Sequence, residues 1–120
     1  MRILHLEAGR RLYGGGRQVL YLLEGLARRG VENLLVCEAE AGIATEARPF
    51  AQVLPLPLSD LRPDLLWRLW RLLRRTRPDL VHLHSRRADL QAALAARLCG
   101  IPCLITRRVD NPEPIWMPVA

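Results

Sequence analysis

Residues 17–37, RQVLYLLEGLARRGVENLLVC, pair a helix pattern with a strand pattern and decide the fold. At 100° per residue, the apolar side chains of 17–29 fall on one face, which predicts a helix covering one side of a sheet. Gly30 follows two arginines and suits a left-handed helix cap. Residues 33–37 (NLLVC) are almost continuously apolar, which is typical of a strand buried on both faces. The pair predicts a parallel α/β sheet.

The rest of the chain repeats this alternation of strands and helices. Further strands are expected at 2–6, 51–54, 79–84 and 103–106, and further helices at 63–76 and 88–99, with one helical turn within 41–50. Ser59 or Asp60 is a candidate cap for the helix at 63–76. Because βαβ units are right-handed, the simplest strand order is 3-2-1-4-5. We predict a Rossmann-like parallel sheet of about five strands with helices on both faces, in one domain at 1–110 with an irregular tail at 111–120.

The composition places the chain among globular proteins with an excess of positive charge. Half of its 120 residues are apolar, a quarter are charged, the formal net charge is +6, and all 18 basic residues are arginine. The excess is either a solvated basic surface or an attraction for phosphates or an anionic membrane. Nucleic acid is not expected as a partner, because the arginine pairs are scattered and no nucleic-acid-binding motif is present.

The cysteines and the N-terminal sequence predict a cytoplasmic location. Cys37, Cys99 and Cys103 lie in apolar stretches without a C-x-x-C pair, so we interpret them as reduced core residues. No apolar run approaches the roughly 20 residues of a membrane helix, and the N-terminus does not resemble a signal peptide. The protein is expected in the cytoplasm, or peripherally on the inner face of the cytoplasmic membrane.

A glycine triplet precedes the first predicted helix. Gly14, Gly15 and Gly16 let backbone amides approach a ligand, and the helix N-terminus and Arg17 add positive charge, so a phosphate or sugar oxygen is favoured there. The alternative is a turn that only needs positive φ. The spacing is not that of the dinucleotide-binding G-x-G-x-x-G motif, so we discount Glu38 as a ribose ligand of an NAD enzyme.

Two histidines mark the end of the strand predicted at 79–84. His82 and His84 share one face; we interpret His82 as a core residue and expect His84, at the strand end, to face a ligand together with Ser85. His5 would approach them if the first and fourth strands were neighbours. No carboxylate or thiolate has ligand spacing here, so no metal site is predicted.

Two adjacent arginines follow the fifth predicted strand. Arg107 and Arg108 present forked donors that suit a diphosphate or a phosphorylated acceptor. Solvated ion pairs with Asp110 or Glu113 are the alternative.

The helix predicted at 63–76 is strongly amphipathic. Its leucines form one face and its arginines the other, and Trp67 projects among the arginines. An aromatic tip on a basic face is typical of interfacial membrane binders, so peripheral membrane contact is predicted around Trp67 and Arg71, in addition to packing on the sheet.

Three segments together resemble a known family. The glycine triplet before the helix ending LARRG, then RPDLVHLHS and ARLCGIPCLIT, resemble in this order the N-terminal domain of the family 4 (group 1) retaining glycosyltransferases over about residues 2–108. The resemblance implies an acceptor-side domain of a two-domain GT-B enzyme, with a nucleotide sugar as donor substrate and no cofactor. It also implies a C-terminal donor-binding domain that these 120 residues do not include, so the fragment alone is expected to be inactive.

One departure leaves the catalytic residues unassigned. The family commonly has Thr-x-His-Gly after the fifth strand, whereas Thr106 is followed here by Arg107 and Arg108. Two functions stay open. The first is part of a glycosyltransferase acting on an envelope glycan or lipid-linked acceptor. The second is a non-catalytic α/β module that binds a phosphorylated ligand or an anionic membrane surface.

Overall fold

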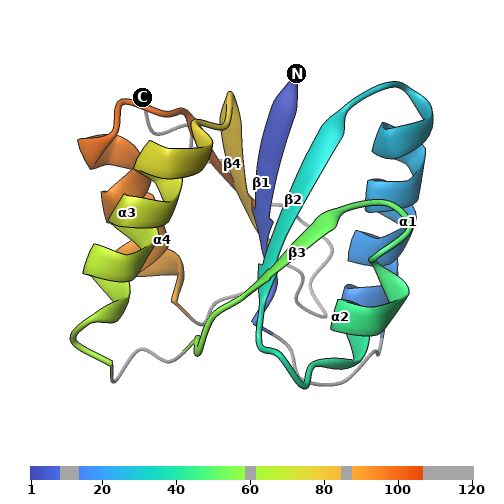
Figure 1. The fold of residues 1–120 in the computed structure, drawn as a ribbon, viewed down its shortest axis with the longest axis horizontal. Helices are drawn as coiled ribbons and strands as arrows, with labels where there is room; N and C mark the ends of the chain where they lie inside the picture. Colours follow the sequence, from blue (N-terminus) through green and yellow to red (C-terminus); the bar gives the residue numbers. More distant parts are fainter. Residues whose placement is uncertain (9–13, 59–61, 85–87, 107–120) are drawn as a thin grey trace.

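Five parallel strands form a single sheet in the computed structural model, which describes residues 1–8, 14–58, 62–84 and 88–106 (Figure 1). The strands are β1 (Arg2–Leu6), β2 (Glu32–Cys37), β3 (Gln52–Pro55), β4 (Leu80–Leu83) and β5 (Cys103–Ile105). Their order is β3-β2-β1-β4-β5, as predicted. The carboxyl ends of all the strands therefore lie at one edge of the sheet.

Helices cover both faces of this sheet. Figure 1 shows α1 (Gly14–Arg28) and α2 (Gly42–Glu46) on one side, and α3 (Leu65–Thr76) and α4 (Asp89–Leu98) on the other. Successive strand side chains point to opposite faces, so each strand supplies both layers. Leu4 and Leu34 pack into the core under α3 and α4, whereas Leu35 packs under α1 and α2. The predicted burial of residues 33–37 on both faces of the sheet is confirmed.

The glycine triplet belongs to a helix, which corrects one prediction. Gly14, Gly15 and Gly16 form the first turn of α1, three residues before the predicted start at Arg17. Glycine costs about 1 kcal/mol per helical position relative to alanine. The cost is offset by tertiary packing, since Val19 is fully buried farther along the same helix. The first amides of α1 still have no intrahelical acceptor, as at any helix N-terminus.

The other element boundaries lie within two residues of the predicted positions. The N-cap of α3 is not one of the two residues predicted for it. Asp64 occupies that position without a side-chain capping bond, and its carboxylate pairs instead with Arg68 at 2.9 Å. The candidate caps Ser59 and Asp60 lie outside the described residues. Gly30 closes the turn after α1 with φ of 84°, as predicted. None of the described helices is long and apolar enough to cross a membrane.

Candidate functional site at the carboxyl edge of the sheet

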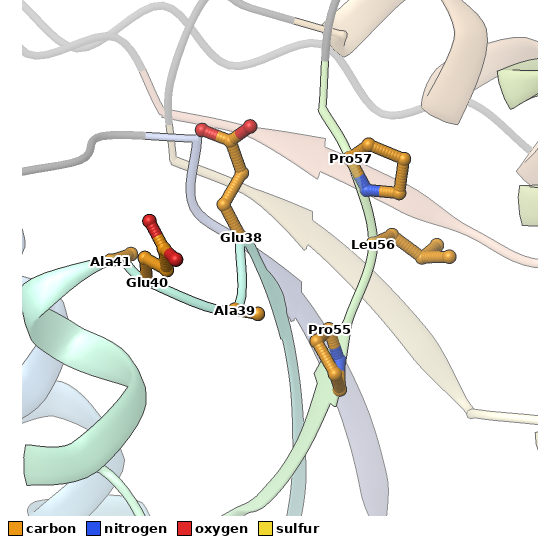
Figure 2. Close-up of a pocket in the computed structure, with 7 residues that line it drawn as sticks. All are labelled: Glu38, Ala39, Glu40, Ala41, Pro55, Leu56 and Pro57. Atoms are coloured by element: carbon orange, nitrogen blue, oxygen red, sulfur yellow. The ribbon is translucent and has the colours of Figure 1, made fainter.

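A cavity of about 580 Å³ opens where β2 and β3 end. One wall follows β2 and includes the side chains of Glu38 and Glu40, and the other is the segment from Pro55 to Pro57, which leaves β3 (Figure 2). Ligands of open parallel sheets collect at this edge, outside the carboxyl ends of the strands. The position fits the sequence prediction, although none of the described residues of the predicted site lines this cavity.

The two walls of this cavity offer different chemistry. Glu38 and Glu40 present carboxylates, which accept hydrogen bonds from hydroxyl or ammonium groups and repel phosphate. The opposite wall is apolar through Pro55, Leu56 and Pro57. A polyhydroxylated ring fits both walls, because its hydroxyls meet the carboxylates while its C–H face packs against proline and leucine.

A second hollow of about 490 Å³ lies between the same segment and α3. It shares Pro55 and Leu56 with the first cavity, and Arg68, Arg71 and Arg75 line its other side. The Arg71 guanidinium lies 4.8 Å from the centre of the Trp67 ring, within cation–π range, and Trp67 is 56 % exposed. The basic aromatic face predicted from the sequence therefore exists and adjoins the carboxyl edge.

Three histidines gather on the sheet face that α1 covers. β1 and β4 are neighbours, and their register places His5 directly opposite His82. His84 follows on the same face, one position beyond the end of β4, where its backbone amide still donates to Leu6. His5 is fully buried and His84 is 3 % exposed. The approach of His5 to the histidines of β4 is confirmed.

Hydrogen bonds join two of these imidazoles to an asparagine on β2. Asn33 donates through Nδ2 to the carbonyl oxygens of Leu23 and Phe50, at 3.0 and 3.2 Å, so its Oδ1 faces the other way. That oxygen lies 3.1 Å from Nε2 of His5, and Nδ1 of His5 lies 3.0 Å from Nε2 of His84. The chain Asn33–His5–His84 crosses three adjacent strands or strand ends.

The third histidine makes a separate contact. Nε2 of His82 lies 2.8 Å from Oγ1 of Thr106, which follows β5. Ring nitrogens of His5, His82 and His84 lie within 4.8 Å of one another, the one group in the described ranges with the composition of a metal site. A metal ion there would have to replace the bond between His5 and His84. That no metal binds stays a prediction.

The predicted site residues divide into three groups. Gly14, Gly15 and Gly16 open α1 at the carboxyl edge, and Arg17 follows them with an exposed side chain. His84 stands at the same edge but is buried. Ser85, Arg107 and Arg108 lie outside the described residues, as does the tail at 111–120.

The last residue of the connection between β4 and α4 has a strained backbone. Ala88 has φ of 66°, an unusual value for a residue with a β-carbon, and precedes α4 as its N-cap. Its side chain is fully buried, so packing holds this conformation in place. Such strain concentrates at functional sites and here lies on the connection that starts at His84.

Sequence reasoning missed Asn33, Glu40 and the role of Thr106. Asn33 lies inside an apolar run and is only 3 % exposed. Because a buried polar side chain needs hydrogen-bond partners, a polar residue within an apolar run was the signal that could have identified it. Glu40 follows the second strand by three residues, at the edge where ligands collect.

Comparison with known proteins identifies the family. The model of Glycosyltransferase Family 4 matches residues 13–111. A stretch of 37 residues is 40% identical to the Escherichia coli UDP-Gal:alpha-D-GlcNAc-diphosphoundecaprenol alpha-1,3-galactosyltransferase, and covers 31% of this chain and 10% of that protein.

Solved structures support the fold at low identity. MurG of Acinetobacter baumannii and a glycosyltransferase of Rickettsia africae each superpose with a TM-score of 0.72 and 16% identity over 88% of this chain. The chain spans 34% and 29% of those two proteins. The family match covers most of the chain, and the fold agrees with it: this chain belongs to Glycosyltransferase Family 4.

Proposed function

We propose that the chain is the acceptor-side part of a glycosyltransferase that moves a sugar from a nucleotide sugar to an envelope glycan or lipid-linked acceptor. The family match over residues 13–111 carries this proposal. The names of the relatives support the kind of substrate, since the Escherichia coli protein is named for a UDP-sugar and a diphosphoundecaprenol-linked acceptor. The location that follows is the cytoplasm or the inner face of the cytoplasmic membrane.

The cavity between Glu38 and Pro57 is the proposed place for a sugar ring of the acceptor. Its two carboxylates can accept hydrogen bonds from ring hydroxyls, and its proline wall can pack against a ring face. Phosphate groups belong elsewhere, because two carboxylates disfavour them. For the phosphates of the donor we retain the predicted contacts from the first turn of α1, Arg17, Arg107 and Arg108.

The basic face of α3 is the proposed membrane contact. Trp67 and Arg71 project from the side opposite the buried leucines, where an indole can enter the headgroup layer while arginines meet anionic lipids. This contact would bring the adjoining cavity close to a lipid-linked acceptor.

A transfer assay on the complete polypeptide tests the sugar cavity. The doubly substituted Glu38→Gln/Glu40→Gln protein should show an acceptor KM raised about tenfold, the equivalent of one lost charged hydrogen bond, with the donor KM unchanged. Glu24→Gln, on α1 and paired there with Arg28, is the matched control and should leave both constants unchanged. An unchanged acceptor KM in the double variant would remove the cavity from the acceptor site.

Vesicle co-sedimentation tests the membrane contact and the rival function. Arg71→Ala should weaken binding to anionic vesicles about fivefold, near 1 kcal/mol for one arginine, and salt should weaken it further. Arg28→Ala removes one exposed arginine from the opposite side of the sheet and should have little effect. Vesicle binding without sugar transfer by the complete polypeptide would favour the non-catalytic module.

A further inference from the structure

The hydrogen-bond chain from Asn33 to His84 fixes the position of each proton along it. Nδ2 of Asn33 must be the nitrogen of the amide, because both of its other partners are backbone carbonyls, which only accept. Oδ1 is therefore the atom near His5, and a carbonyl oxygen cannot donate. Nε2 of His5 must carry the hydrogen of that bond.

The protonation of His5 determines which ring nitrogen of His84 carries hydrogen. A fully buried imidazole stays neutral near pH 7, because burial disfavours its charged form. With its hydrogen on Nε2, neutral His5 has a lone pair on Nδ1. Only Nε2 of His84 can then supply the hydrogen of the 3.0 Å contact.

We propose that Asn33 and His5 are positioning residues that hold His84 as the Nε2–H tautomer, leaving Nδ1 as the accepting atom of its ring. With hydrogen on Nε2, Nδ1 of the neutral ring accepts hydrogen bonds and does not donate them. The tautomer itself does not depend on the proposed function, whereas its effect on acceptor binding rests on that function.

The positions of the three residues favour a positioning role over simple core filling. Each comes from a different strand or strand end, and the amide of Asn33 is itself held by carbonyls of α1 and of the segment before β3. The orientation of the His84 ring is thus tied to three separate elements. A side chain that only filled space at this position would need no such chain of polar atoms.

Nitrogen-15 NMR on the 120-residue chain tests the tautomer directly. Long-range proton–nitrogen correlations at pH 7 should show hydrogen on Nε2 and a lone pair on Nδ1 for both His5 and His84. A hydrogen on Nδ1 of His84 in the unsubstituted protein would overturn the proposal, whether or not any variant folds.

Two variants separate positioning from stability. Asn33→Leu removes the acceptor of His5 and should let both imidazoles populate the second tautomer, although Asn33 does not touch His84. Leu35→Ala, on the same strand and under the same helix, leaves the polar chain intact and should keep both tautomers. Altered tautomers in Leu35→Ala, or unchanged ones in a folded Asn33→Leu, would refute the positioning role.

The complete polypeptide tests whether the orientation of His84 matters for acceptor binding. Asn33→Leu should raise the acceptor KM about fivefold, near 1 kcal/mol for one neutral hydrogen bond, with little change in the donor KM. An unchanged acceptor KM together with the expected tautomers would refute this role in acceptor binding and leave the tautomer assignment standing. Absence of transfer by the unsubstituted polypeptide would refute the proposed function instead.

Discussion

Lowering the pH from 7 to 5 should destabilise this domain through His5. Burial lowers the pKa of this imidazole from 6.5 to about 4, and the hydrogen bond to Asn33 opposes the shift only in part. Between pH 6.5 and about 4, His5 binds a proton in the unfolded chain but not in the folded chain. The contribution of neutral His5 to stability is therefore complete above pH 6.5 and is lost as the pH falls toward 4.

The magnitude follows from the two pKa values. Linkage gives a loss of about 2 kcal/mol at pH 5 and about 3 kcal/mol at pH 4, relative to neutral pH. Domains of this kind are stable by roughly 5–15 kcal/mol, so the effect is large. Carboxyl groups contribute little between pH 7 and 5, because they ordinarily titrate near 4 and stay mostly ionised above pH 5.

Urea unfolding at pH 7, 6 and 5 measures this loss, and His5→Gln supplies the control. The glutamine amide can still donate to Oδ1 of Asn33 but does not titrate, so the variant should start from a lower stability and lose less between pH 7 and 5 than the unsubstituted protein. Near-ultraviolet and far-ultraviolet circular dichroism should report the same transition if unfolding has two states. An equal loss in the variant and in the unsubstituted protein would refute the assignment to His5.

Three further predictions concern the packing of α3 and the thiols. Leu69→Ala should lower the free energy of unfolding in urea by about 2–5 kcal/mol, because Leu69 is 2 % exposed in the core beneath α3 and α4. A loss below about 1 kcal/mol would mean that neighbouring side chains fill the cavity left by the substitution. Arg77→Gly should be about 1 kcal/mol more stable than Arg77→Ala, since φ of 47° strains any residue with a β-carbon, and equal stabilities would contradict this. Burial raises the pKa of Cys37 and Cys103 to about 11, so both thiols should resist alkylation at pH 8 until urea unfolds the domain. Rapid alkylation of these thiols in the native protein would contradict their burial.

The arrangement of the strands was predictable because it follows from alternation alone. Residues 33–37 identify a strand buried on both faces, and helices between successive strands require parallel pairing. These local patterns determine which strands are neighbours. The proximity of His5 to His82 then followed from the order β2-β1-β4.

The first turn of α1 and the cavity at β2 were not predictable on these grounds. Glycine is a poor helix former, so Gly14 to Gly16 resembled a loop, but packing farther along α1 outweighs that propensity. The cavity depends on how the segment from Pro55 to Pro57 leaves the sheet, which no local pattern specifies. The partners of Asn33 likewise come from α1 and from the segment before β3, far from it in sequence.

Charge divides the carboxyl edge between two kinds of ligand group. The chain carries a net charge of +6, yet the cavity at β2 and β3 contains two glutamates. Arg68, Arg71 and Arg75 lie across the shared Pro55–Leu56 segment. A phosphorylated sugar would therefore bind in one orientation, with its ring toward the glutamates and its anionic group toward α3. Exchanging Arg71 for glutamate should weaken binding of the phosphorylated sugar more than binding of the same sugar without phosphate. Equal losses for both ligands would show that the two hollows do not share a ligand.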